Sequence, residues 1–113
     1  MNKREVGGEY ERKAAEYLTR QGMTILEMNY RVRIGEIDII ARDGGYLVFV
    51  EVKYRSGKNQ GGAAYAISES KKRKIYRVAQ WYMVQHHIPQ ESYCRFDAVL
   101  IDRSEITHIK NAW

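Results

Sequence analysis

The chain has 113 residues, which fits one folded domain and is too short for two. Apolar residues make up 44% and charged residues 29%, values that exclude a disordered or low-complexity chain. Nineteen Lys and Arg against fourteen Asp and Glu give a net charge of +5, which suits a polyanionic partner without requiring one.

Localisation signals are absent from the sequence. The first residues include basic side chains but no apolar run behind them, so we expect no secretory signal. No stretch reaches the length of a membrane-spanning helix. A single cysteine, Cys94, cannot form an internal disulfide and is typical of a reducing compartment. We therefore expect a soluble cytoplasmic protein, with residues 1–113 forming one domain that does not contact a membrane.

The N-terminal third favours a helix followed by strands. Residues 9–21 combine helix-forming side chains with apolar side chains at helical spacing, and Gly22 follows where a C-terminal cap belongs. Residues 24–26 are predicted to form a short strand. Residues 29–33 then lead into a second strand at 35–41.

A β-hairpin is predicted around Asp43-Gly44-Gly45, because glycine adopts positive φ without a side-chain clash. The strand that follows, residues 46–54, alternates so that Leu47, Phe49, Glu51 and Lys53 share one face. One face of this strand therefore belongs to a core, and the other mixes apolar and charged groups.

The C-terminal half predicts a loop, a helix and two strands. Residues 56–62 have the glycine and polar content of a flexible flap. Ser68 or Ser70 caps a helix that runs to about His86. Strands are expected at 93–101 and 106–109. A strand on either side of a helix indicates a βαβ crossover, so the fold class is α/β with a mixed central sheet flanked by helices.

Asp38 and Glu51 have matching parity across the predicted hairpin. A two-residue loop makes paired residue numbers sum to an odd value, which places both carboxylates on the same face. With Gly44 and Gly45 as the loop, Asp38 lies directly opposite Glu51; with Asp43 and Gly44 it is a diagonal neighbour. A three-residue loop without a bulge would separate them onto opposite faces.

Two carboxylates that face each other repel, and a divalent cation is one way to compensate them. Mg²⁺ (or Mn²⁺) prefers one or two carboxylates together with waters and phosphate oxygens. Lys53 faces the same way and would orient the attacking water or stabilise developing charge. This set is typical of phosphodiester hydrolysis. The alternative is a surface ion pair of Glu51 with Lys53 or Arg55 that has no chemical role.

Asp38 followed by Glu51-Val52-Lys53 resembles the PD-(D/E)xK nuclease superfamily, although Ile37 stands where that motif has proline. A wider pattern resembles the bacterial UPF0102 (YraN-like) family along almost the whole chain. It comprises Gly8-Glu9, Ala14 to Leu18, Asn29-Tyr30-Arg31, Gly35 to Asp38, Phe49 to Lys53, and Arg95-Phe96-Asp97.

The resemblance implies a restriction-endonuclease-like core similar to archaeal Holliday junction resolvases. It implies Asp38 and Glu51 as metal ligands and Lys53 as the catalytic lysine. Glu9 matches the acidic residue of the first helix that assists the metal site, although a first-turn Glu also favours the helix dipole. Asp97 is open between an ion-pair partner and a support of the site.

Nucleic-acid contacts are predicted for basic side chains near the site and at the start of the second helix, where each could equally be a solvated charge. These residues are Arg31, Arg33, Arg55, Lys71 and Lys74. His86, His87, Cys94 and His108 follow no zinc-ligand spacing.

Three functions are compatible with these observations. A metal-dependent endonuclease acting on DNA, with branched or structured DNA as a candidate substrate, uses all three site residues, and a resolvase would need a homodimer to cut two strands. A non-catalytic nucleic-acid-binding module would bind without metal and with strong salt dependence. A protein-interaction scaffold would expose an apolar patch.

Overall fold

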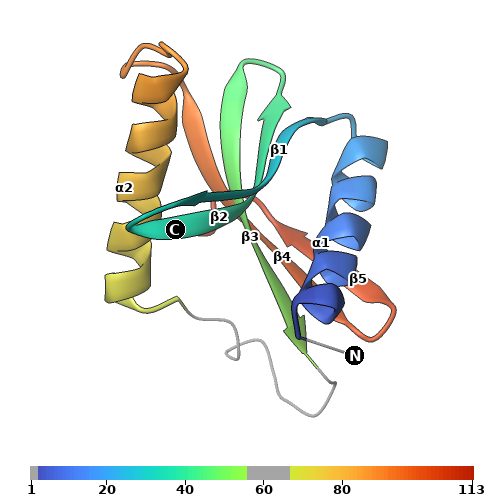
Figure 1. The fold of residues 1–113 in the computed structure, drawn as a ribbon. Coiled ribbons are helices and arrows are strands. Elements are labelled where there is room, and N and C mark those ends of the chain that lie inside the picture. Colours follow the sequence, from blue (N-terminus) through green and yellow to red (C-terminus); the bar gives the residue numbers. More distant parts are fainter. Residues whose placement is uncertain (1–2, 56–66) are drawn as a thin grey trace.

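The computed structural model describes residues 3–55 and 67–113, and side chains from residue 8 to 54 and from 67 onwards. Within these residues the elements follow the order α1 (Lys3–Arg20), β1 (Thr24–Val32), β2 (Gly35–Asp43), β3 (Tyr46–Arg55), α2 (Glu69–Gln85), β4 (Cys94–Asp102) and β5 (Glu105–Ile109). The strands form one sheet in the order β1-β2-β3-β4-β5, with one helix on each face (Figure 1).

The sheet is mixed. β3 and β4 are parallel, whereas β1 with β2, β2 with β3, and β4 with β5 are antiparallel. α2 lies between the parallel strands in sequence, as a βαβ crossover requires. The predicted α/β class is therefore confirmed, and the arrangement is consistent with a restriction-endonuclease-like core.

Several element boundaries differ from those expected. α1 begins at Lys3 rather than at residue 9. β1 is one strand with a bulge between Ile25 and Glu27, so the break expected within it is absorbed without ending the strand. The cap of α2 is Ser68, whose hydroxyl accepts a hydrogen bond from the Lys71 backbone N–H at 3.1 Å. The flap predicted at 56–62 lies outside the described residues.

Each face of the sheet packs against one helix. Side chains of β3 alternate as predicted, with Val48 and Val50 under α1 and Leu47 and Phe49 under α2. From the helices, α1 contributes Ala14 and Leu18, and α2 contributes Ile75, Val78, Ala79, Tyr82 and Met83. Burial of these apolar surfaces on both faces positions the two helices against the strands.

The C-terminal residue, Trp113, lies on the α2 side of the sheet. Trp113 packs against the α2 cluster, with its ring centroid 5.8 Å from that of Phe96, so it docks on the core of this chain. Among the described residues, no helix combines the length and the apolar character needed to cross a membrane.

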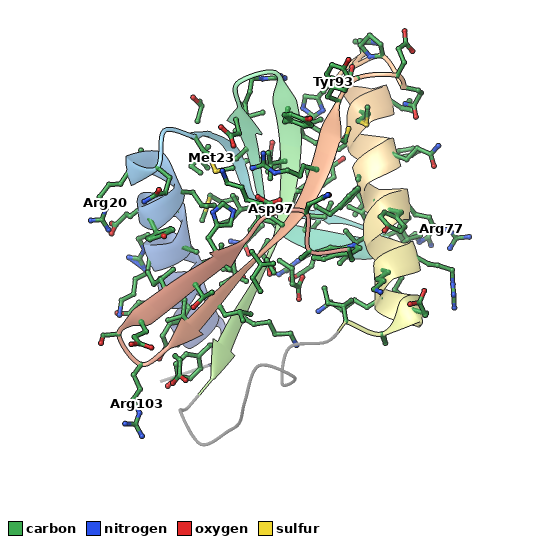
Figure 2. The ribbon with its side chains drawn as sticks, turned by 180° about the vertical axis from the view of Figure 1, so that it is seen from behind. Arg20, Met23, Arg77, Tyr93, Asp97 and Arg103 are labelled. Carbon is green, nitrogen blue, oxygen red and sulfur yellow. The ribbon has the colours of Figure 1, made fainter. Side chains whose placement is uncertain are left out.

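A buried carboxylate on β4 connects this strand to β5 and to the β2–β3 turn. The Asp97 side chain, on β4 near the middle of the molecule (Figure 2), has no solvent exposure. Arg95 Nε and His108 Nε2 lie 2.9 and 2.7 Å from its oxygens, and the Asn111 backbone N–H donates to it at 2.9 Å. Arg95 also donates to Asp43 at 2.9 Å. Asp97 is therefore an ion-pair partner that joins β4, β5 and the β2–β3 turn.

Burial acts to raise the pKa of Asp97, but the hydrogen bonds from His108, Arg95 and the Asn111 backbone outweigh it and lower the pKa below its ordinary value. A carboxyl with a lowered folded-state pKa stabilises the fold above its unfolded-state pKa of 3.8. That contribution is lost as the pH falls from about 4 through the folded-state value.

We expect Asp97→Asn to lower the free energy of unfolding at pH 7 by about 3 kcal/mol, because it leaves the largely buried Arg95 guanidinium without its main counter-charge. Urea unfolding at pH 7 and pH 3 measures this, and the difference from the parent should shrink at pH 3. Asp102→Asn on the same strand serves as control and should change stability by less than ~0.5 kcal/mol. A loss at pH 7 that equals the control's would contradict the assigned role.

Candidate functional site

The β2–β3 hairpin has the two-residue loop that the sequence predicts. Asp43 pairs with Tyr46 around Gly44 and Gly45, and Gly44 adopts a φ of 60°. The same register continues to Ile39 opposite Val50 and ends there. Asp38 and Glu51 come next on their strands.

At Asp38 the two strands separate. β2 continues beside β1 towards Gly35, whereas β3 continues beside β4 to Arg55. The Val52 backbone N–H donates to Asp38 Oδ2 at 2.8 Å, so a side chain supplies the acceptor that a continued ladder would offer. The expectation that Asp38 and Glu51 form a ladder pair is thus corrected, because they lie one step beyond the last pair, at a fork between the strands.

Both carboxylates at the fork are withdrawn from water. Asp38 is 8% exposed and Glu51 is 6% exposed. Burial, followed by the negative charge of Glu51, raises the pKa of Asp38 to about 8, against the opposing hydrogen bond from the Val52 N–H. An isolated fork would therefore hold a proton on Asp38 at neutral pH, and a bound cation would favour its release.

The acidic residue that α1 brings to the fork is Glu11 rather than Glu9. Glu9 is exposed, whereas Glu11 is half-buried. Burial raises the pKa of Glu11, and hydrogen bonds to Asn29 and Asp38 act in the opposite direction. Residues two apart on a helix point about 200° apart, so only one of these acids can face the sheet.

A signal for Glu11 exists in the sequence. Glu11 lies three residues before Ala14 and seven before Leu18, which is the helical spacing of the buried face. The Gly8-Glu9 motif indicates Glu9 instead of Glu11, because a match along the chain carries no information on which face of the helix is buried.

Two lysines lie on or near the fork. Lys53 is half-buried on β3, two residues beyond Glu51 and on the same strand face. Among the described residues it has no ion-pair partner. Lys71, in the first turn of α2, was expected to contact phosphate. Its Nζ instead lies 2.5 Å from Glu51 Oε2.

The remaining basic residues lie outside this group. Arg31 Nε is 2.9 Å from Glu36 Oε1 in an exposed pair on the β1–β2 hairpin. Arg33 and Lys74 are exposed. The Arg55 side chain lies outside the described part of the chain.

The donors at the fork are compatible with a hard divalent cation. Among the described residues, no group of three or more His, Cys, Asp or Glu has the spacing of a metal site, so the fork offers a carboxylate pair. Mg²⁺ is commonly held by one or two carboxylates with retained waters and substrate oxygens. Two buried acids, one with a raised pKa, are a donor set that gains from such an ion. Cys94 lies against Met83 and His108 against Asp97, so neither side chain is at the fork.

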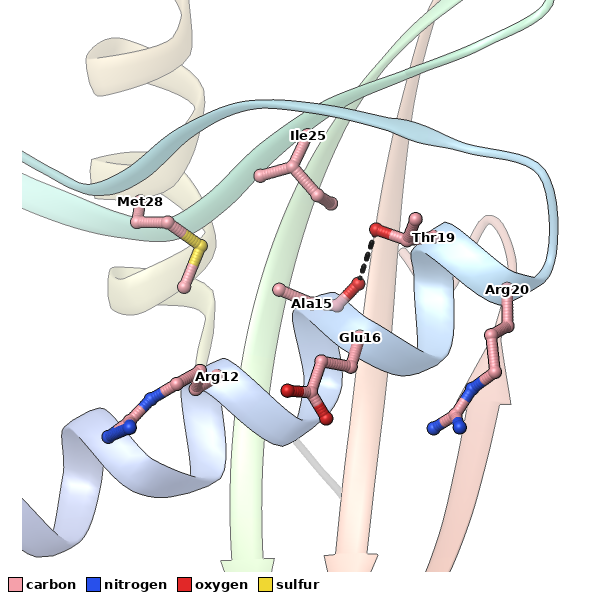
Figure 3. Close-up of a pocket in the computed structure, with 7 residues that line it drawn as sticks. All are labelled: Arg12, Ala15, Glu16, Thr19, Arg20, Ile25 and Met28. Carbon is pink, nitrogen blue, oxygen red and sulfur yellow. Dashed lines mark hydrogen bonds between the residues drawn. The ribbon is translucent and has the colours of Figure 1, made fainter.

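A groove lies between α1 and β1, and the residues that line it differ chemically from those of the fork. This groove of about 520 Å³ has Ala15, Ile25 and Met28 in its floor and charged side chains such as Glu16 at its rim (Figure 3). Its lining contains a single carboxylate, so it lacks the paired acids of the fork.

We expect Asp38→Asn to stabilise the metal-free protein. A carboxyl whose folded-state pKa is raised from 3.8 to about 8 destabilises the fold progressively as the pH rises through that interval. Thermal unfolding in EDTA should therefore show little difference at pH 4 and a gain on the order of 2 kcal/mol at pH 8. The exposed Glu36→Gln is the control and should stay within ~1 kcal/mol. A less stable Asp38→Asn at pH 8 would contradict the assigned cause.

Comparison with known proteins gives a consistent result across the chain. A family model described as "Uncharacterised protein family UPF0102" matches residues 10–101. A UPF0102 protein of Lachnoclostridium phytofermentans is 49% identical over 113 residues, which cover 100% of this chain and 96% of that protein. A UPF0102 protein of Dechloromonas aromatica is 46% identical over 107 residues, covering 95% and 87%. The chain therefore belongs to the UPF0102 family.

Proposed function

We propose that the protein is a metal-dependent nuclease that hydrolyses phosphodiester bonds in DNA, with branched or structured DNA as the preferred substrate. The observation that carries this proposal is the fork, where Asp38 and Glu51 are buried together on diverging strands. Two acids facing a nucleic acid would repel its phosphates unless a cation lay between them. Lys71 compensates Glu51, but no ion pair of the described residues compensates Asp38, so the fork keeps a buried acid that a cation would stabilise.

Each residue at the fork has a distinct role in this proposal. Asp38 and Glu51 hold Mg²⁺ or Mn²⁺, which supplies Lewis-acid polarisation of the phosphodiester when bound. Lys53 presents an ammonium on the same face, where it orients the attacking water or stabilises charge that develops on the phosphate. Glu11, half-buried on α1 beside Asp38, is a positioning residue.

The resemblance of Asp38 and Glu51-Val52-Lys53 to the PD-(D/E)xK motif supports the same chemistry. The names of the UPF0102 relatives state no activity, so family membership alone adds no reaction. Cutting both strands of a junction would require a symmetric dimer, and a cytoplasmic location suits a nuclease of chromosomal DNA.

The first experiment is a cleavage assay. Purified protein is incubated with labelled linear, single-stranded, flapped and four-way-junction DNA and with an RNA, in Mg²⁺, Mn²⁺ or EDTA. We expect metal-dependent cleavage that falls at least ~100-fold in both Glu51→Gln and Lys53→Met, because each removes a group that acts on the reacting phosphate. The preferred substrate separates a junction resolvase from a general nuclease.

Glu105→Gln, an exposed acid on β5, is the matched control and should cleave like the parent. Equal cleavage by the parent and both site variants would remove the fork from the reaction. Absence of cleavage together with salt-sensitive binding would favour the binding module, and absence of both would favour a protein-interaction scaffold.

Phosphate contacts are proposed for the surface that joins the β1–β2 turn to α2. A Cβ atom added at Gly35 would lie 3.3 Å from Val78 Cγ2 and 3.9 Å from Lys74 Cβ, so this turn packs closely on the helix. Arg33, exposed on the turn, and Lys74, exposed on the helix, therefore lie on one side of the molecule.

We expect Arg33→Gln to weaken DNA binding similarly for all sequences and to reduce the slope of log K against log salt by about 0.9, the value for one lost phosphate contact. Fluorescence anisotropy at several salt concentrations measures the slope. Arg103→Gln, at the distant β4–β5 turn (Figure 2), is the control and should leave the slope unchanged. Equal slopes for both variants would rule out this surface.

A further inference from the structure

The ion pair between Lys71 and Glu51 is asymmetric. The Glu51 carboxylate is fixed on β3 with 8% of its side chain exposed, whereas the Lys71 side chain is 45% exposed and reaches it from the first turn of α2. The distance between Lys71 Nζ and Glu51 Oε2 is 2.5 Å. The acid is thus part of the sheet, and the ammonium approaches it from the solvent side.

The position of Lys71 on its helix favours mobility of the ammonium. The backbone N–H of Lys71 is held by the capping hydroxyl of Ser68, so the residue sits where the helix dipole favours acids and disfavours cations. Its side chain is a flexible four-carbon stem with a compact charge. The ammonium can therefore withdraw from Glu51 by rotation of its side chain, with no change in the backbone of α2.

The negative charge of Glu51 attracts the Lys71 ammonium to the fork. Lys71 Nζ reaches Glu51 Oε2, and the next residue on that strand, Val52, donates its backbone N–H to Asp38 Oδ2. The ammonium therefore lies in the field of the same acids that would bind a metal ion. A monovalent ammonium and a divalent ion cannot both occupy the same oxygen of Glu51 without strong repulsion.

We propose that Lys71 is the exchangeable counter-cation of this site, an inference that rests on the proposed function. In the metal-free protein its ammonium neutralises Glu51, and it would leave the carboxylate when Asp38 and Glu51 hold a divalent ion. Lys53 differs because it belongs to β3 itself and keeps its place on the strand when the ion binds.

Competition between the two cations is tested with Mn²⁺ alone. Isothermal titration calorimetry compares the parent with Lys71→Met, which removes the charge and keeps the apolar stem. We expect Lys71→Met to bind Mn²⁺ at least about threefold more tightly, the gain that follows from removing a half-exposed ion pair that the metal must break. Lys72→Met is the matched control, because Lys72 lies on the same helix turn but pairs with Glu69 at 3.1 Å. It should change the affinity by less than about twofold.

Release of the ammonium is tested on the unmodified chain, so this readout does not depend on a variant that folds. An amine-acylating reagent is applied in EDTA and in saturating Mn²⁺, and the labelling of each lysine is followed by mass spectrometry. We expect labelling of Lys71 to rise several-fold with Mn²⁺, because an ammonium that has left Glu51 is open to the reagent, whereas one held in the ion pair is shielded by the carboxylate. Labelling of Lys72 should not change.

The outcomes separate this proposal from the nuclease function. Mn²⁺ binding with unchanged labelling of Lys71, or with no gain in affinity for Lys71→Met over the Lys72 control, would overturn the counter-cation role and leave the nuclease proposal standing. Release of Lys71 without DNA cleavage would support the role and count against the nuclease. No Mn²⁺ binding by the parent or by Lys71→Met would overturn both.

Discussion

The fork between β2 and β3 is the constraint on which the rest of this structure depends. Above it the two strands share a regular ladder from Asp43 and Tyr46 to Ile39 and Val50. Below it they pair with different neighbours, so backbone groups and two acidic side chains face a gap between strands. The Asp38 carboxylate occupies part of this gap by accepting the Val52 N–H. That hydrogen bond both ends the ladder and fixes the position of the acid.

The two helices complete the fork from opposite faces of the sheet. α1 brings Glu11 to Asp38, and α2 brings Lys71 to Glu51. Apolar contacts elsewhere along their length hold both helices against the sheet. The two apolar clusters therefore position the polar groups at the fork, although those groups are not part of either cluster. The apolar packing therefore supplies the stability, and the fork can hold a charge arrangement that is not optimal for folding.

Asp97 is a buried acid of the same sheet whose hydrogen-bond partners are supplied by the chain itself. Its oxygens receive hydrogen bonds from Arg95, His108 and a backbone N–H, and its pKa is lowered. Asp38 receives one backbone hydrogen bond and faces other acids, and its pKa is raised. The difference between these carboxylates is a difference in available positive charge. It distinguishes a structural ion-pair network from a site that gains from an added cation.

Much of this arrangement could be predicted from the sequence because it follows from local rules. Alternation along residues 46–54 and the glycine pair at 44 and 45 determine the register of one hairpin, which ends at Ile39 and Val50 and leaves Asp38 and Glu51 as the next residues on their strands. The partner of Lys71 could not be predicted in this way, because the contact with Glu51 spans 20 residues and depends on how α2 docks on the sheet. The network of Asp97 likewise depends on β5 returning His108 beside β4.

Glu11 represents a third case, in which the information was present but a motif outweighed it. Helical spacing to Ala14 and Leu18 places Glu11 on the buried face, whereas the two-residue motif pointed to Glu9. A motif compares positions along the chain, but an acid reaches a metal site only if its helix turns it inward. For a helix beside a candidate site, the buried face is therefore the stronger criterion for choosing between neighbouring acids.

The net charge of the chain is opposite in sign to the charge of the acids at the fork. The net charge of +5 coexists with the pair of buried acids, Asp38 and Glu51, at the fork. A polyanion attracted by the basic surface would meet this pair at the point of closest approach, and the contact is unfavourable until positive charge is added there. Lys71 contributes one unit of that charge and a divalent ion contributes two. In the proposed function, binding of nucleic acid and binding of metal would therefore be coupled at the fork, because each would reduce the electrostatic cost of the other.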